Sequence, residues 1–178
     1  MRYVALLRAV NVGGTGKLPM AELRELVESL GYTNVQTYIA SGNVVFDGRG
    51  SAESIAKKIA DALRTKRCLD TDVLLRTADE LAPLVDDHAF KDRGASGSRL
   101  HVVFLSGAPT KAAIAKLDPT RSPGDELEVR GREIHWHTPE GAGQSKFSIA
   151  YFERTLGVAG TTRNHNTVTT LLELLRRG

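Results

Sequence analysis

Short apolar runs alternate with stretches of helical periodicity along this 178-residue chain, and their order restricts the fold to few architectures. The first run, Tyr3 to Leu7, predicts a buried strand, and a helix with an apolar face is predicted between Pro19 and Gly31. Further predicted elements are strands at Val35 to Ile39 and Asn43 to Phe46, a helix capped by Ser51, and a strand at Asp72 to Arg76. This βαββαβ order is that of the ferredoxin-like plait, an α+β fold.

The second half of the chain repeats most of this order. Its predicted elements are a leading helix at Asp79 to Val85, a polar loop at Lys91 to Ser98, strands at Leu100 to Leu105, Glu126 to Val129 and Glu133 to His137, and helices at Lys111 to Leu117 and Ser145 to Leu156. A last helix, apolar along one face, stands where the closing strand would be, and burial of that face predicts that it docks. We therefore expect two ferredoxin-like βαββα(β) halves, residues 1–76 and residues 77–178 with the C-terminal helix, or one compact unit built from both.

Composition and charge narrow the class of protein. Hydrophobic residues make up 41% and charged residues 25%, which is typical of a globular protein. No apolar run approaches the roughly 20 residues of a membrane helix, and Arg8 interrupts the first run too early for a signal peptide. The single cysteine, Cys68, excludes an internal disulfide. We expect a cytoplasmic protein with no membrane partner, and the net charge of +3 does not favour nucleic acid as a partner.

Two polar turns are predicted to meet at one edge of the first sheet. In this topology the exit of strand one and the hairpin between strands two and three lie at the same edge. Glycines there expose backbone N–H groups, which form anion-binding concavities, and Arg8 and Lys17 add positive charge. The pattern predicts a site for a small anionic or phosphorylated ligand.

A third polar cluster, residues 161–167, directly precedes the last helix. Asn and Thr there are good N-caps, which explains one or two of its residues, and a helix N-terminus also attracts anions. We expect this segment to face the same edge, together with Lys146 from a glycine-flanked break. The predicted ligand-binding residues are Arg8, Asn11, Gly13, Gly14, Lys17, Ser41, Gly42, Asn43, Lys146, Thr162, Arg163 and Asn164.

The sequence does not match the known cofactor-binding motifs, because particular residues differ from those that the motifs require. A phosphate loop ending at Lys17 needs glycine at Asn11 and Ser or Thr at Leu18, and a dinucleotide fingerprint needs glycine at Pro19, so we expect no cofactor. His101, His135 and His137 on one sheet face would suit zinc. Because no carboxylate or water-activating partner is evident nearby, we expect these histidines to face solvent and to bind no metal. We also expect His88 to lie at the surface.

Other functions use the same features. An enzyme would employ the same pocket with His165 or Lys146 as acid or base, although no catalytic residue is identified. An interaction protein would pair a sheet face or edge with a second copy to form a homo-oligomer. RNA binding through Arg and backbone contacts is a weaker alternative, because the strand at Asn43 to Phe46 supplies one aromatic at most.

Four stretches of the chain resemble a known family. They are LLRAVNVGG, TYIASGNVVF, GQSKF at Gly143 to Phe147, and TTRNHNTVTTLLEL, in the order and spacing of the bacterial domain-of-unknown-function family sixteen-ninety-seven. The resemblance implies a duplicated α/β plait and a cytoplasmic protein, and it implies no activity. This sequence departs from the family pattern at Ala9, Ala40, Phe147 and His165, where the family usually has glycine, glutamine, leucine and tryptophan. Ala40 and His165 belong to two of the predicted polar clusters, so this member is expected to differ if the ligand is recognised there.

Overall fold

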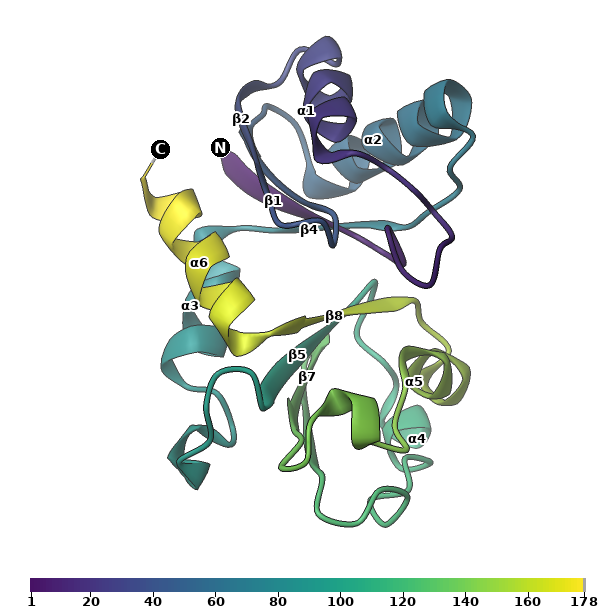
Figure 1. Cartoon of the computed structure of the whole chain (residues 1–178), viewed down its shortest axis with the longest axis vertical. Helices are drawn as coiled ribbons and strands as arrows, with labels where there is room; N and C mark the ends of the chain where they lie inside the picture. Colours follow the sequence, from purple (N-terminus) through teal and green to yellow (C-terminus); the bar gives the residue numbers. More distant parts are fainter. Residues whose placement is uncertain (178) are drawn as a thin grey trace. The chain divides into compact units, whose positions relative to one another are not determined.

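The computed structural model describes residues 1–177 and divides them into two compact units (Figure 1). Unit 1 comprises Met1–Leu81 and the segment from Leu171 onward, and unit 2 comprises Ala82–Thr170. Each unit contains a four-stranded antiparallel sheet with helices, which confirms the α+β class. No helix within residues 1–177 is both long and apolar enough to cross a membrane.

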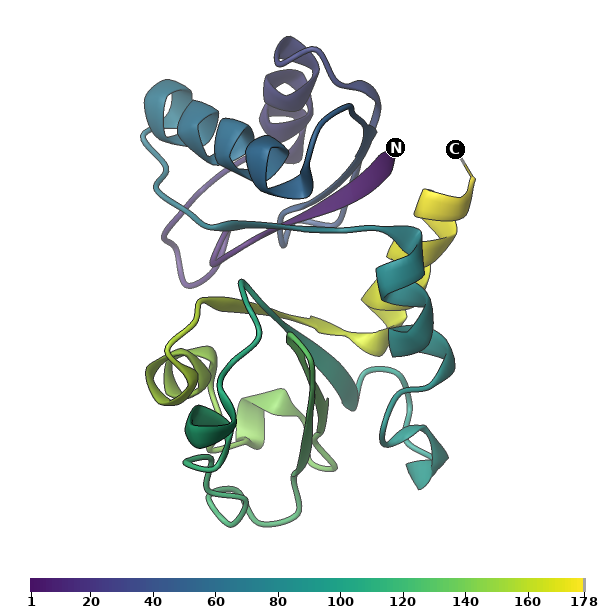
Figure 2. The ribbon, with the colours of Figure 1, turned by 180° about the vertical axis from the view of Figure 1, so that it is seen from behind.

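Unit 1 has the predicted βαββαβ order. Its elements are β1 (Arg2–Leu7), α1 (Met20–Ser29), β2 (Thr33–Tyr38), β3 (Asn43–Asp47), α2 (Ala52–Arg67) and β4 (Val73–Arg76). The strands are ordered β2-β3-β1-β4, and Figures 1 and 2 show α1 and α2 on the same side of this sheet. Leu7, Val27, Phe46 and Ile59 belong to the core between them. The Ser51 side chain accepts a hydrogen bond from Ser54 N–H and caps α2, as predicted.

Unit 2 repeats this architecture with shorter helices. Its elements are η1 (Lys91–Arg93), β5 (Leu100–Leu105), α4 (Lys111–Ile114), β6 (Glu126–Arg130), β7 (Glu133–His137), η2 (Ala142–Gln144), α5 (Ile149–Leu156) and β8 (Gly160–Asn164). The predicted start of α5 at Ser145 was wrong: Ser148 is its N-cap, and the Ser145 hydroxyl instead donates to the Asp125 carboxylate. Trp136 of β7 and Phe152 of α5 belong to the core of this unit.

β8 closes the second sheet, whose strand order is β6-β7-β5-β8. The prediction that a helix takes the place of this strand was wrong, because the helix follows the strand. Residues 161–164 lack the apolar alternation by which a half-buried strand is recognised. Thr161 and Arg163 are nevertheless buried in β8, where a hydrogen bond between their side chains replaces apolar packing.

The two halves share their strand register. Arg76 of β4 pairs with Val4 of β1, and Arg163 of β8 pairs with Val102 of β5. A helix follows each closing strand: α3 (Ala78–Asp86) after β4, and α6 (His165–Arg176) after β8. The predicted apolar face of α6 is buried at Val168, Leu171, Leu172 and Leu175, which confirms that this helix docks. Each half is therefore a complete βαββαβ plait followed by a helix.

Two glycines of unit 1 provide a test of packing at the edge of the first sheet. Gly42 and Gly14 have similar φ angles of 82° and 79°, but a Cβ at Gly42 would lie 2.9 Å from Leu7 Cβ, whereas a Cβ at Gly14 meets nothing within 4 Å. Both Gly→Ala variants should lose about 1–2 kcal/mol to left-handed strain. Gly42→Ala should lose a further 1–3 kcal/mol, roughly, through overpacking. Urea unfolding of both variants measures the difference, and equal midpoints would contradict this packing.

Candidate functional site

The glycine-rich loop after β1 and the turn between β2 and β3 meet at one edge of unit 1, which we call the rim (residues 8–17 and 38–43). The Asn11 side chain connects them: its Nδ2 donates to Ala40 O at 2.7 Å and to Leu18 O at 2.8 Å. Its Oδ1 accepts from Leu18 N–H at 2.8 Å. Leu7 N–H also donates to Gly42 O at 2.9 Å. The predicted proximity of these two turns is confirmed.

Asn11 and Asn43 hold the rim together through their side chains. The amide of Asn11 makes the hydrogen bonds described above, and its φ of 56° lies in the left-handed region that Asn tolerates. Asn43 is fully buried, and its Nδ2 donates to Tyr38 O and to Ser41 Oγ, both at 3.0 Å. These contacts assign a positioning role to two residues that were predicted to bind the ligand directly.

The tip of the loop offers backbone donors and positive charge. Gly13, Gly14 and Lys17 are exposed, and the two glycines have φ angles of 60° and 79°. Within residues 1–177, the hydrogen bonds of the loop do not involve the N–H groups of Gly13 and Gly14. Arg8 is half-buried, and its Nε lies 4.0 Å from Asp72 Oδ2. The Arg8 charge is therefore partly balanced, whereas Lys17 projects into solvent.

A hollow that is mostly apolar adjoins the rim and is lined partly by rim residues. Its volume is about 350 Å³, and its lining residues are Asn11, Lys17, Leu18, Pro19, Met20 and Ala40. Val12 and Ile39, the chain neighbours of two lining residues, are 60% and 48% exposed. Sequence reasoning predicted a polar pocket here and missed the apolar component. The sequence signal was the presence of Val12 and Ile39 within turns otherwise rich in glycine and polar residues.

Several residues with an unfavourable backbone conformation also lie at the rim. Five non-glycine residues of the described chain have positive φ, and three of them, Ala9, Asn11 and Ile39, lie here. Ile39, with φ of 49°, is β-branched, so this conformation is a true outlier. Such a residue costs about 1–3 kcal/mol, and strain of this kind clusters at functional sites. The rim is therefore the best candidate site in unit 1.

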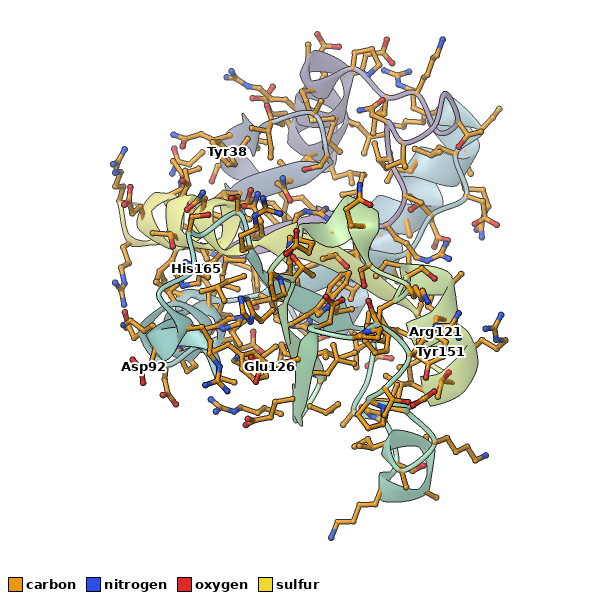
Figure 3. The ribbon with its side chains drawn as sticks, turned by 60° about the horizontal axis from the view of Figure 1, so that its bottom comes forward. Tyr38, Asp92, Arg121, Glu126, Tyr151 and His165 are labelled. Atoms are coloured by element: carbon orange, nitrogen blue, oxygen red, sulfur yellow. The ribbon has the colours of Figure 1, made fainter. Side chains whose placement is uncertain are left out.

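The other predicted ligand residues belong to unit 2. Lys146 is exposed, and its backbone is fixed by hydrogen bonds to Ser122 Oγ and from Arg121 Nε. Figure 3 shows Arg121 beside Tyr151, and its guanidinium carbon lies 4.3 Å from the centre of that ring. That Lys146, Thr162, Arg163 and Asn164 complete the rim site stays a prediction.

Residues 161–167 are not the free polar turn that was predicted. Arg163 is 6% exposed, and its Nη1 donates to Thr161 Oγ1 at 2.7 Å and to Thr162 O at 2.9 Å. Burial lowers the pKa of the Arg163 guanidinium to about 10. The Asn164 side chain accepts from Thr167 N–H at 2.9 Å and caps α6. Arg163 thus anchors β8, and Asn164 has the N-cap role that Asn favours.

The histidines of the sheet are buried, so the prediction of solvent-facing side chains was wrong. His88, His101, His135 and His137 are all less than 9% exposed. His101 pairs with Trp136, whereas His135 pairs with Val102, so His101 faces the side of the sheet opposite to His135. The predicted sharing of one face by three histidines was therefore also wrong. Among residues 1–177 no group of three or more His, Cys, Asp or Glu could hold a metal.

Burial favours the neutral form of these rings, and hydrogen bonds fix the ring nitrogens of two of them. His88 Nε2 donates to His101 O at 2.9 Å, and His88 Nδ1 accepts from Phe90 N–H. His135 Nδ1 accepts from Ala89 N–H at 3.1 Å, and the His88 and His135 ring centres are 4.8 Å apart. Burial lowers the pKa of His101 and of His135 from 6.5 to about 4. Protonation would turn an accepting nitrogen into a donor and place charge in the interior.

These buried histidines predict acid lability in a defined pH range. Because the folded pKa is depressed, the stabilising contribution is complete above pH 6.5 and is lost as pH falls toward about 4. Each of His101 and His135 should account for a loss on the order of 3 kcal/mol, since a unit of pKa is about 1.4 kcal/mol. His135→Asn keeps an acceptor for Ala89 N–H and should flatten the decline. Urea unfolding at pH 7.5, 6.0 and 5.0 measures it, and an unchanged pH slope in the variant would contradict the assignment.

Removing the Asn11 side chain should lower the stability of the protein without adding backbone strain. Asn11→Gly keeps the left-handed backbone available but removes the side chain that binds Leu18 and Ala40. At about 1 kcal/mol per hydrogen bond, the free energy of unfolding should fall by about 2–3 kcal/mol. Asn34→Gly is the matched control, because Asn34 also has positive φ but makes an exposed bond to Asp47. Equal melting temperatures for the two variants would argue against a stabilising role of the Asn11 hydrogen bonds.

Comparison with known proteins identifies the family. The solved structure titled "The structure of conserved bacterial protein SP0830 from Streptococcus pneumoniae" has a TM-score of 0.72 and 24% identity, with 98% of each chain covered. At this identity the likeness shows a shared fold and nothing more. No curated protein matches the chain. The family model described as a protein of unknown function (DUF1697) matches residues 1–135, which include the rim. The chain therefore belongs to the DUF1697 family.

Proposed function

We propose that this protein is a binding module whose site is the rim of unit 1 and whose ligand is a small anionic or phosphorylated molecule. The observation that carries the proposal is the coincidence of exposed strained residues, above all Ile39, with the glycine-rich loop. An isoleucine that is exposed and left-handed contributes little to the core of unit 1. A functional role for the turn, in which this backbone conformation helps to bind a ligand, explains why the protein tolerates the conformational cost of Ile39.

The anionic part of the ligand would bind at the loop tip. Gly13 and Gly14 are exposed, and within residues 1–177 their N–H groups take part in none of the loop's hydrogen bonds. A glycine backbone lets an anion approach without obstruction by a Cβ. Lys17 follows in the same loop and brings a full positive charge. Neighbouring amides and one ammonium form the kind of concavity in which proteins hold phosphate or carboxylate groups. Arg8 would contribute less, because Asp72 balances part of its charge.

The proposal concerns binding and names no reaction. Asn11 connects the two turns by a hydrogen bond, and Asn43 braces the second turn through Ser41. No nucleophile or acid–base pair is assigned at the rim. We also propose a cytoplasmic location and the capacity to form homo-oligomers, and neither depends on the geometry of the rim.

Titration of the ¹⁵N-labelled full chain with inorganic phosphate tests anion binding. The amide signals of Gly13 and Gly14 should move in a saturable way, while those of strand β6, which holds no predicted ligand residue, stay in place. Lys17→Ala should weaken binding by about fivefold, since an exposed charge contact is worth about 1 kcal/mol. Lys111→Ala is the control, because it removes the same charge from an exposed position in α4. Equal weakening by both variants would show a general charge effect and overturn the proposed site.

A further inference from the structure

We propose that the ligand of the rim is amphiphilic: a small phosphate or carboxylate whose apolar group, a short alkyl chain or a single ring, occupies the hollow beside the loop. This inference rests on the proposed function and adds a class of ligand to it. A purely inorganic anion would use only the loop tip and would leave the hollow unexplained.

The hollow is apolar and adjoins the positive charge. Pro19, Met20 and Ala40 line it, and Leu18, which also lines it, belongs to the buried core of unit 1. Lys17 lines the same hollow, so one side chain borders both the apolar space and the glycine-rich loop. This adjacency fits a molecule with a charged end and an apolar end, because each end meets a surface of matching chemistry.

Ile39 provides independent support. It precedes Ala40 in the chain, is 48% exposed, and keeps a φ of 49° where glycine or asparagine would be less strained. Val12, 60% exposed, precedes Gly13 on the other turn. Together they place apolar surface in water on both turns of the rim, each next in the chain to a residue that lines the hollow. An apolar group that extends past the hollow would cover that surface. An anion alone would gain nothing from either side chain.

The volume of the hollow limits the ligand. About 350 Å³ is at the low end of the range of roughly 300–1,000 Å³ found for small-molecule sites. It admits a short chain or one ring, and not the paired acyl chains of a bilayer lipid. We therefore commit to a free, water-soluble ester or acid.

A series of monoalkyl phosphates tests the inference. Affinity for the full chain should rise by about two- to fourfold with each added methylene from methyl to butyl phosphate, since one buried CH₂ is worth about 0.8 kcal/mol. Ile39→Gly should remove much of this dependence without lowering the melting temperature. Ala9→Gly is the matched control, because Ala9 also has positive φ at the rim, and it should keep the full dependence. Ile39→Asn, which also tolerates this φ, is a second variant in case the glycine loosens the turn.

The outcomes separate this inference from the proposed function. If inorganic phosphate shifts the Gly13 and Gly14 amides but chain length has no effect, the apolar part is wrong and anion binding stands. If neither inorganic phosphate nor any ester shifts them, both are wrong. Equal loss of the chain-length dependence in Ile39→Gly and Ala9→Gly would overturn the role of the isoleucine side chain. Binding to phosphatidic acid vesicles, but not to soluble esters, would overturn the commitment to a free ligand.

Discussion

The amide side chain of Asn11 is the interaction on which the rim depends. Its donors and its acceptor are all engaged within unit 1, by Leu18 on one side and Ala40 on the other. An aspartate could accept from Leu18 N–H but could not donate to either carbonyl, and a leucine could do neither. This side chain and the bond from Asn11 N–H to Gly16 O close the base of the loop, and the side chain connects it to the neighbouring turn. The glycines at the tip stay exposed.

Comparison of the two copies of the fold shows which contacts belong to the shared scaffold and which belong to the candidate site alone. Leu7 N–H donates to Gly42 O in unit 1, and Leu105 N–H donates to Arg132 O in unit 2, both at 2.9 Å. The bond from Arg8 N–H to Asp72 O likewise has its equivalent between Ser106 and Ala159. The plait thus fixes where each first strand ends and which turn lies beside it. The first copy has the glycine-rich loop there, whereas the second has Ser106 to Thr110 with a single glycine, so the plait does not itself require that loop.

Sequence periodicity predicted the elements whose buried faces are apolar, and it failed where burial is polar. β1 and β5 were found because Leu and Val mark their cores, and β7 because the Arg130-Gly131 hairpin signal precedes it. β8 instead fills its buried positions with Thr161 and Arg163. The burial of the histidines depends on strand register and on the segment at 88–90, which a local pattern does not reveal. At the rim, topology was enough to bring the two turns together. The left-handed backbone at Ile39 was not predictable, because a β-branched residue argues against that conformation.

Strain and exposure at the rim have one physical explanation in common. Residues such as Ile39 lower the stability of the free protein twice, through an unfavourable backbone conformation and through apolar surface left in water. The surrounding structure tolerates this because β1 and β3 are buried along nearly their whole length and hold the turns from beneath. A rigid base with an unfavourable surface is what pre-organisation for a ligand requires, since the conformational cost is met in folding and not at binding. Under the proposed function, the charged loop and the apolar hollow are parts of a single recognition surface.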